Sequence, residues 1–350
     1  MAKRERIRAS NLKGENRKPR KEPLEAVDKE VLENFRRDGV VMVENVLHSE
    51  WLLLLELGLQ RVLNNSSQEL HLFFEGQEGE FIETIRNFEV IPEIRRLIFD
   101  SPIADLIGKL ISSDNLWLYS DEFFIKQGGN SARTPWHQDT PYWPVAGQQI
   151  ASAWVSLDYL SKEECLEYVA GSHRGTIYDG FNPSKVKEDP TLPHYGQEYP
   201  ALPDIEKNRE LYDIRAWEIT PGDIIFAHPS VLHGGGPTGP TSQRRAITIR
   251  IYGDDIRYAS RPKSKPTVPL TPGLALAIKP GEPLRSPWYP RIRPIPKHLQ
   301  EELGSKLLVD TIFFNDRFTL YKYLQNRSIN WILLWSVSYT HLTLPTNREV

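Results

Sequence analysis

The segment TPWHQDTPYWP, residues 134–144, places a histidine and an aspartate two positions apart in a segment that contains three prolines. Proline fixes the backbone φ angle and removes a hydrogen-bond donor, so we expect a strand end or a rigid turn here rather than a long regular element. Such a segment can aim His137 and Asp139 at one point. The pair is typical of a metal site if a third ligand meets it, and of an ordinary turn before Pro141 if none does.

The candidate third ligand is His233, which precedes the three glycines at the end of the segment GDIIFAHPSVLHGGG, residues 222–236. The glycines that follow it allow a sharp turn and a close approach of a ligand. Arg244 stands eleven residues further on, at the start of the strand-like run RRAITIRIYGDD. Two histidines and one carboxylate are the facial triad of non-haem Fe(II) oxygenases, which leaves three positions for a bidentate co-substrate and O2. A nearby arginine can hold the far carboxylate of that co-substrate by a forked pair.

Other interpretations of these residues remain open at this point. His137 and His233 could be polar core residues with satisfied hydrogen bonds. Arg244 and Arg245 are adjacent, so on a strand they face opposite sides, and periodicity does not choose between them. We interpret His173 and His228 as structural, because the odd spacing of His228 from His233 would place it on another face of a strand.

The aromatic side chains near the first histidine have two interpretations. Trp136, Tyr142 and Trp143 either line a substrate pocket or pack in the core. Cys165 is the single cysteine of the chain, and we interpret it as a small buried hydrophobic residue.

The order of the elements predicts the fold class. Helical patterns over about 28–39, 49–65 and 91–111 come first. Short strand-like runs separated by turn signals follow from about residue 115 onward, with a proline- and charge-rich insertion at 176–212. This order favours an α+β, mainly β, fold: a sandwich or open barrel with the N-terminal helices packed outside it.

Composition gives no strong signal for several classes of protein. The net charge of −3 over 350 residues gives no strong signal for nucleic acid or membrane. A single cysteine rules out an intramolecular disulfide and fits a reducing compartment. The start of the chain is basic and lacks the apolar core of a signal peptide, so we expect a cytoplasmic protein. The oligomeric state is not predicted.

The globular part, residues 28–294, resembles the phytanoyl-CoA dioxygenase family of Fe(II)/2-oxoglutarate oxygenases. The matching segments occur in the family's order and spacing; they are DGVVMVENVL, WHQDTPYWP, ASAWVSLDYL, CLEYVAGSHRG, GDIIFAHPSVLHGGG and QRRAITIRIYGDD. Ala170, where the family usually has proline, and Glu164, where glycine is common, depart from the pattern away from the proposed metal ligands.

The resemblance implies a double-stranded β-helix, a jelly-roll of the cupin-like kind, that hydroxylates a small organic or lipid-like substrate and releases succinate and CO2. It implies Fe(II) on His137, Asp139 and His233, and 2-oxoglutarate held by Arg244, which the family's offset from His233 favours over Arg245. It places Trp154 near the co-substrate. O2 is the other co-substrate, and ascorbate is a candidate stimulant.

The predicted organisation has three parts: a disordered basic arm at 1–23, an oxygenase domain at 24–294 and a C-terminal tail at 295–350. The arm holds nine Lys and Arg against three Glu. About the last fifteen residues resemble a translated sequencing adapter, so we assign no function to them. Two alternatives remain: a non-catalytic β-helix protein that binds a small molecule, and an oxygenase that acts on nucleic acid or protein through the basic arm.

Overall fold

The computed structural model describes residues 22–64, 71–73, 79–127, 129, 131–181, 193–196, 198–262 and 268–295. The predicted basic arm and C-terminal tail lie almost entirely outside these residues. The regular elements therefore belong to the segment for which an oxygenase domain was predicted.

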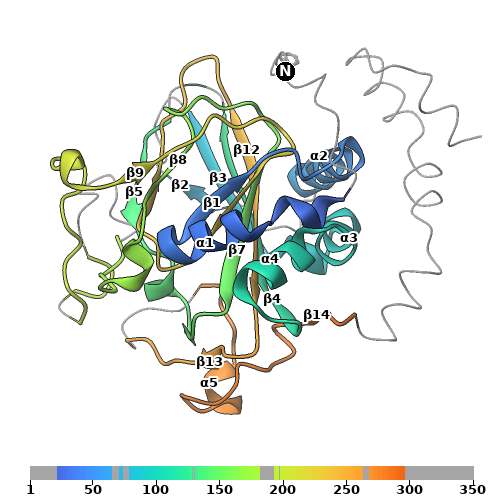
Figure 1. Ribbon diagram of the computed structural model, residues 1–350, viewed down its shortest axis with the longest axis vertical. Helices are drawn as coiled ribbons and strands as arrows, with labels where there is room; N and C mark the ends of the chain where they lie inside the picture. Colours follow the sequence, from blue (N-terminus) through green and yellow to red (C-terminus); the bar gives the residue numbers. More distant parts are fainter. Residues whose placement is uncertain are drawn as a thin grey trace, which may run out of the picture. The chain divides into compact units, whose positions relative to one another are not determined.

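The core of the fold is two antiparallel sheets that face each other (Figure 1). The large sheet has, in spatial order, β1 (Val40–Val43), β10 (Ile224–Ala227), β7 (Ile150–Ser156), β12 (Arg244–Tyr252), β4 (Leu116–Gln127), β3 (Glu80–Ile85) and β2 (His71–Phe73), with β14 (Arg291–Arg293) also paired to β4. The small sheet has β5 (Thr134–His137), β11 (His233–Gly235), β8 (Leu166–Val169) and β9 (Ile214–Arg215). A further pair joins β6 (Val145–Ala146) and β13 (Arg257–Tyr258). The prediction of a mainly β, jelly-roll core is confirmed.

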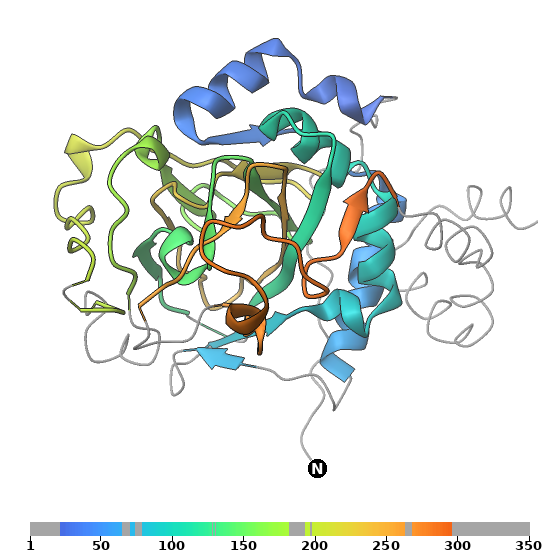
Figure 2. The ribbon, with the colours of Figure 1, turned by 90° about the horizontal axis from the view of Figure 1, so that it is seen from below.

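The N-terminal helices cover the outer face of the large sheet, as predicted, whereas the short helix near residue 275 lies beside β13 (Figures 1 and 2). The α-helices are α1 (Lys29–Asp38), α2 (Ser49–Asn64), α3 (Pro92–Asp100), α4 (Ile103–Ile111) and the short α5 (Leu274–Ala277). Asp28 caps the start of α1 by accepting from the Val31 N–H at 2.9 Å. Gly39 ends that helix in the left-handed region, with a φ of 74°, and β1 follows at once.

Short 3-10 helices lie in the connections: η1 (Pro23–Ala26), η2 (Asn87–Glu89), η3 (Thr140–Tyr142), η4 (Ser172–Arg174) and η6 (Arg209–Leu211). The predicted insertion at 176–212 lies between β8 and β9, which are neighbours in the small sheet. Within the described part of the chain, no helix is long and apolar enough to cross a membrane.

Strand β12 determines which side chains reach the space between the sheets. Side chains alternate along a strand, so those at 244, 248 and 250 point inward and line one cavity. Ile247 and Ile249 alternate with them and are fully buried on the opposite side, where the helices pack. Because β12 pairs with both β7 and β4, its inner face lies near the middle of the large sheet.

Candidate metal centre

His137 and His233 lie opposite each other on adjacent strands of the small sheet. The register of β11 against β5 pairs them directly, and their ring centroids are 4.2 Å apart. Asp139 follows β5 by two residues, and its backbone N–H donates to the Pro229 carbonyl at 2.8 Å. This bond ties the turn after β5 to the turn before β11. The local chain path thus brings all three predicted ligands together.

The potential ligand atoms converge on one point. Asp139 Oδ1 lies 3.6 Å from His137 Nε2 and 3.8 Å from His233 Nε2. One ligand atom from each of the three residues lies within 4.8 Å of the others, and among the described residues this is the group that meets that test. The three side chains are 13–17% exposed, so they line a partly enclosed space.

Hydrogen bonds orient both imidazoles for metal binding. His137 Nδ1 lies 2.8 Å from the Pro135 carbonyl oxygen, and His233 Nδ1 lies 3.0 Å from that of Val231. A carbonyl oxygen can only accept, so each Nδ1 carries the hydrogen and each Nε2 presents its lone pair. The two Nε2 atoms are the ones that face Asp139.

The electrostatics of the site favour the metal-binding protonation states. Burial, with the neighbouring His137, lowers the pKa of His233 to about 4, although Asp139 raises it. His233 is therefore a neutral imidazole near neutral pH. Burial alone would raise the pKa of Asp139, but His137, Arg250 and His233 together lower it far below its usual range. A neutral imidazole beside an ionised carboxylate is the donor set that a divalent cation requires.

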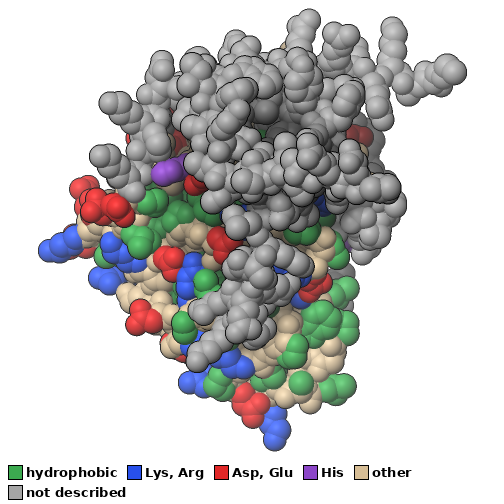
Figure 3. Space-filling view, turned by 90° about the vertical axis from the view of Figure 1, so that its right-hand side faces the viewer, with side chains coloured by type: hydrophobic (Ala, Val, Ile, Leu, Met, Phe, Trp, Pro, Cys, Tyr) green, Lys and Arg blue, Asp and Glu red, His purple; other side chains and the backbone are tan. Residues whose placement is uncertain are grey.

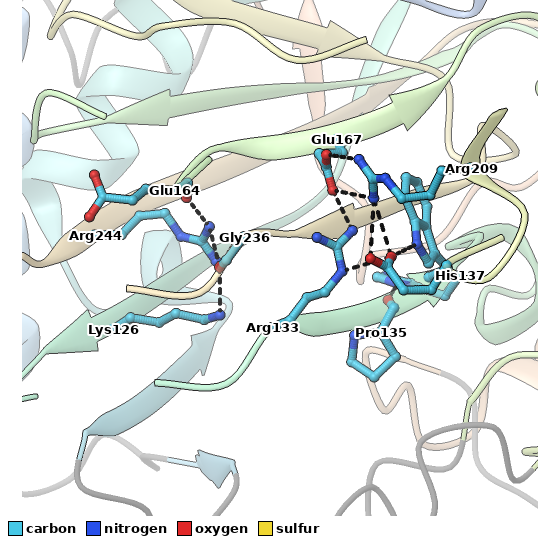
Figure 4. A network of polar contacts seen from close by, with 11 residues as sticks. Lys126, Arg133, Pro135, His137, Glu164, Glu167, Arg209, Gly236 and Arg244 are labelled. Atoms are coloured by element: carbon cyan, nitrogen blue, oxygen red, sulfur yellow. Dashed lines mark hydrogen bonds and ion pairs between the residues drawn. The ribbon is translucent and has the colours of Figure 1, made fainter. Parts of the chain in front are cut away.

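Arg244 and Arg245 point to opposite sides of β12. Arg244 lines the cavity that contains the triad, and its Nη1 donates to the carbonyl oxygens of Glu164 at 2.7 Å and Gly236 at 3.3 Å (Figure 4). Arg245 forms buried ion pairs with Asp158 and Glu56 instead. Of the two arginines, Arg244 is therefore the one within reach of a ligand in the cavity.

The other residues singled out from the sequence fall into two groups. Trp154 lines the cavity. Tyr142 and Trp143 pack in a buried aromatic cluster, and Trp136 packs against Val169 and Leu232. Among the residues that line the cavity of the triad, none of these last three aromatics is present, although Trp136 lines a second cavity near Glu206. Cys165 is buried as expected, and burial raises its pKa to about 11.

The expected placement of His228 is wrong. It lines the same cavity as His233 rather than another face. The spacing argument assumed one continuous strand, but β10 ends at Ala227 and β11 begins at His233 in the other sheet. The ring of His173 lies 5.6 Å from that of His228, outside the group of possible metal ligands.

Sequence reasoning missed several charged residues on the inner face of the large sheet. The Nη2 atom of Arg250 lies 3.7 Å from Oδ2 of Asp139, and the same guanidinium forms an ion pair with Glu122 on β4. Lys126, also on β4, donates to the carbonyls of Ala132 and Gly236, the second of which it shares with Arg244 (Figure 4). Burial lowers the pKa of Lys126 to about 5, so it is neutral near neutral pH. The signal in the sequence was that Glu122 and Lys126 are four residues apart on one strand, so they share a face, in a run that is largely apolar.

An ion network supports the small sheet from outside. Glu167 on β8 pairs with Arg133, which precedes β5, and with Arg209 from the connection to β9 (Figure 4). Because Arg133 and Glu167 flank the strands that carry His137 and His233, this network stabilises the pairing that brings the two imidazoles together.

The family model for phytanoyl-CoA dioxygenase (PhyH) matches residues 35–246. The chain is 27% identical over 204 residues to a protein of Caenorhabditis elegans named "Probable phytanoyl-CoA dioxygenase". The aligned region covers 53% of this chain and 60% of that protein. It is also 27% identical over 133 residues to the peroxisomal phytanoyl-CoA dioxygenase of Homo sapiens, and this aligned region covers 37% of each chain. The chain thus spans less than two thirds of the length of these curated relatives.

A solved structure shares the fold. The epimerase SnoN, in complex with Fe3+, alpha ketoglutarate and nogalamycin RO, superposes with a TM-score of 0.58 at 22% identity, over 76% of this chain and 100% of that one. At this level of identity the likeness concerns the fold alone.

Proposed function

The chain belongs to the phytanoyl-CoA dioxygenase family, and from that premise we propose that it is an Fe(II)- and 2-oxoglutarate-dependent dioxygenase. It hydroxylates a small organic substrate, with O2 as oxidant and with release of succinate and CO2. The catalytic unit is residues 24–294. The proposed compartment is the cytoplasm, which the single buried cysteine supports.

One observation carries the proposal: two imidazole nitrogens and one carboxylate oxygen converge in the wall of a cavity that also contains a buried arginine. Two histidines and a carboxylate occupy one face of an octahedral metal and leave the other face open. A structural metal site would instead use all of its positions for protein ligands. The open face is the arrangement that a metal-dependent oxidation requires.

Each residue has a role in this proposal. His137, Asp139 and His233 would hold the iron through Nε2, Oδ1 and Nε2. When bound, Fe(II) supplies the activation of O2 that no protein side chain can provide. Arg244, a cation whose pKa burial lowers only to about 10, holds the distal carboxylate of 2-oxoglutarate. Trp154 forms an apolar wall beside it, and the enclosed site excludes water from the reacting atoms.

The proposed substrate is a small molecule. The structural neighbour SnoN contains nogalamycin RO, a small molecule, on the same fold. On the face drawn in Figure 3, basic and acidic side chains are interspersed over the described surface rather than gathered by sign. Nucleic-acid binding uses a surface on which Lys and Arg cluster, so this face favours a small-molecule substrate.

The test is turnover by the purified protein. It is incubated with Fe(II), ascorbate, 2-oxoglutarate and a metabolite extract, and mass spectrometry follows succinate and metabolites that gain one oxygen. We expect succinate formation that depends on 2-oxoglutarate, and one or a few metabolites heavier by one oxygen atom. A His233→Ala variant is the matched control. If the wild type forms no more succinate than this variant, the proposal is wrong.

A further inference from the structure

The two carboxylate oxygens of Asp139 face different partners. Oδ1 faces the Nε2 atoms of His137 and His233, at 3.6 and 3.8 Å. Oδ2 faces the guanidinium of Arg250, with its Nη2 at 3.7 Å. One oxygen thus lies on the metal side of the carboxylate and the other on the arginine side.

The Arg250 side chain is held on further sides. Its Nη1 forms a hydrogen-bonded ion pair with Glu122 Oε2 on the neighbouring strand β4. Its guanidinium carbon lies 5.1 Å from the centroid of the Trp143 ring. The side chain is 7% exposed, so little water competes for these contacts. Arg250 is therefore a fixed charge rather than a mobile one.

We propose that Arg250 is a positioning residue that keeps Asp139 a one-oxygen ligand of the metal. This inference rests on the proposed function. Iron accepts about six ligand atoms. Two imidazoles, one carboxylate oxygen and the two chelating atoms of 2-oxoglutarate fill five positions and leave the sixth for O2. If both oxygens of Asp139 bound the metal, that sixth position would be lost.

The partners of Arg250 supply the charge that holds it. Glu122 is buried and is hydrogen-bonded to Glu83 on β3. Burial, with the negative charge of Glu122, raises the pKa of Glu83 well above its usual value. Glu122 therefore lies between Glu83, with which it shares a hydrogen bond, and Arg250, with which it forms an ion pair. One cation, Arg250, then lies between the carboxylates of Glu122 and Asp139.

The experiment replaces Arg250 by methionine, which keeps much of the side-chain length but removes the charge. Three quantities are measured: the affinity for Co(II) without oxygen, the KM for O2 in succinate formation, and the crystal structure with Co(II) and 2-oxoglutarate. We expect Co(II) affinity to be kept and Asp139 to bind Co(II) through both oxygens. The KM for O2 should rise by about 10-fold or more, the scale on which partners of metal ligands affect activity. Arg250→Lys, which restores a cation, should recover part of the response to O2.

A purely structural role would give another result. In that case Arg250→Met would weaken Co(II) binding and would leave the KM for O2 unchanged. If the variant does not fold, Glu122→Gln replaces it, because it weakens the anchor of Arg250 and should shift the KM for O2 in the same direction by less.

The outcomes separate this inference from the proposed function. The inference alone is overturned if the wild type forms succinate but the Arg250→Met variant keeps an unchanged KM for O2 and binds the metal through one oxygen of Asp139. A wild type that binds no Co(II) overturns both.

Discussion

Replacing Arg244 by alanine is the most direct test of the co-substrate end of the cavity. Its Nη1 donates to the carbonyl oxygens of Glu164 and Gly236, at 2.7 and 3.3 Å. In the part of the chain that the structure describes, no carboxylate lies within ion-pair distance of this buried guanidinium. Burial lowers its pKa only to about 10, so it stays a cation near neutral pH. A ligand carboxylate is the counter-ion that this charge lacks.

The expected effect of Arg244→Ala follows from that geometry. Truncating one member of a buried, hydrogen-bonded charge pair costs about 2–5 kcal/mol. At about 1.4 kcal/mol for each factor of ten, the dissociation constant for 2-oxoglutarate should rise by about 30-fold or more. The assay is titration of 2-oxoglutarate into metal-loaded protein without oxygen, together with the KM for 2-oxoglutarate in succinate formation. Arg244→Lys keeps a charge but loses the planar fork, so it should fall between wild type and Arg244→Ala.

Arg245 provides the matched control, because it lies next in the chain and faces away from the cavity. Its ion pairs with Glu56 at 2.9 Å and Asp158 at 2.8 Å are buried. Arg245→Ala should lower the free energy of unfolding by about 3–5 kcal/mol, measured with urea, while the folded protein keeps its affinity for 2-oxoglutarate. Wild-type affinity in Arg244→Ala would refute the reasoning. The reverse ranking of the two variants would move the role to Arg245.

Three further predictions concern the metal, the buried acid pair and the basic arm. His137→Ala should abolish Co(II) binding with the circular dichroism spectrum unchanged; tight stoichiometric iron with normal succinate formation in this variant would rule out the ligand assignment. Glu83 ionises in the unfolded chain before it does in the folded protein, so stability should fall as pH rises above about 4.5, until Glu83 ionises in the folded state as well. In Glu83→Gln the free energy of unfolding, measured with urea at about pH 5 and about pH 8, should fall less between the two pH values than in the wild type. An equal fall in both proteins would contradict this prediction. Deleting residues 1–21 should leave succinate formation unchanged, whereas a salt-sensitive loss of binding to double-stranded DNA would favour a nucleic-acid substrate.

The sequence predicted those features that depend on neighbouring residues alone: helix ends, the alternation of side chains along a strand, and turns. The helix at Lys29–Asp38 has a capping aspartate before it and a glycine after it, and both signals are local. Adjacent arginines at the start of a strand must face opposite sides, and β12 shows this for Arg244 and Arg245. Proline and glycine around His137 and His233 indicated turns, and the structure has both histidines at strand ends.

Long-range features were beyond the sequence. Glu83, Glu122 and Arg250 come from three strands, and their meeting depends on how β3, β4 and β12 are aligned in one sheet. Register between distant strands is set by packing of the whole sheet, which one sequence does not show. The failure for His228 has a local cause. Pro229 follows the end of β10, so the run up to His233 is a turn between the sheets and the alternation rule does not apply.

The inner face of β12 unites the two proposals. Arg244 and Arg250 are six residues apart and share that face, and about 20 Å of extended strand separates their α-carbons. Arg250 contacts Asp139, whereas Arg244 lies by Gly236, just beyond β11, so the two cations lie at different ends of the cavity. In the proposed enzyme one cation selects the carboxylate of the co-substrate, and the other occupies the second oxygen of the metal's own carboxylate. A shift of β12 by one residue would turn both arginines away from the cavity at once. Because β7 and β4 fix the register of β12 from both sides, this pairing matters for the chemistry as well as for stability.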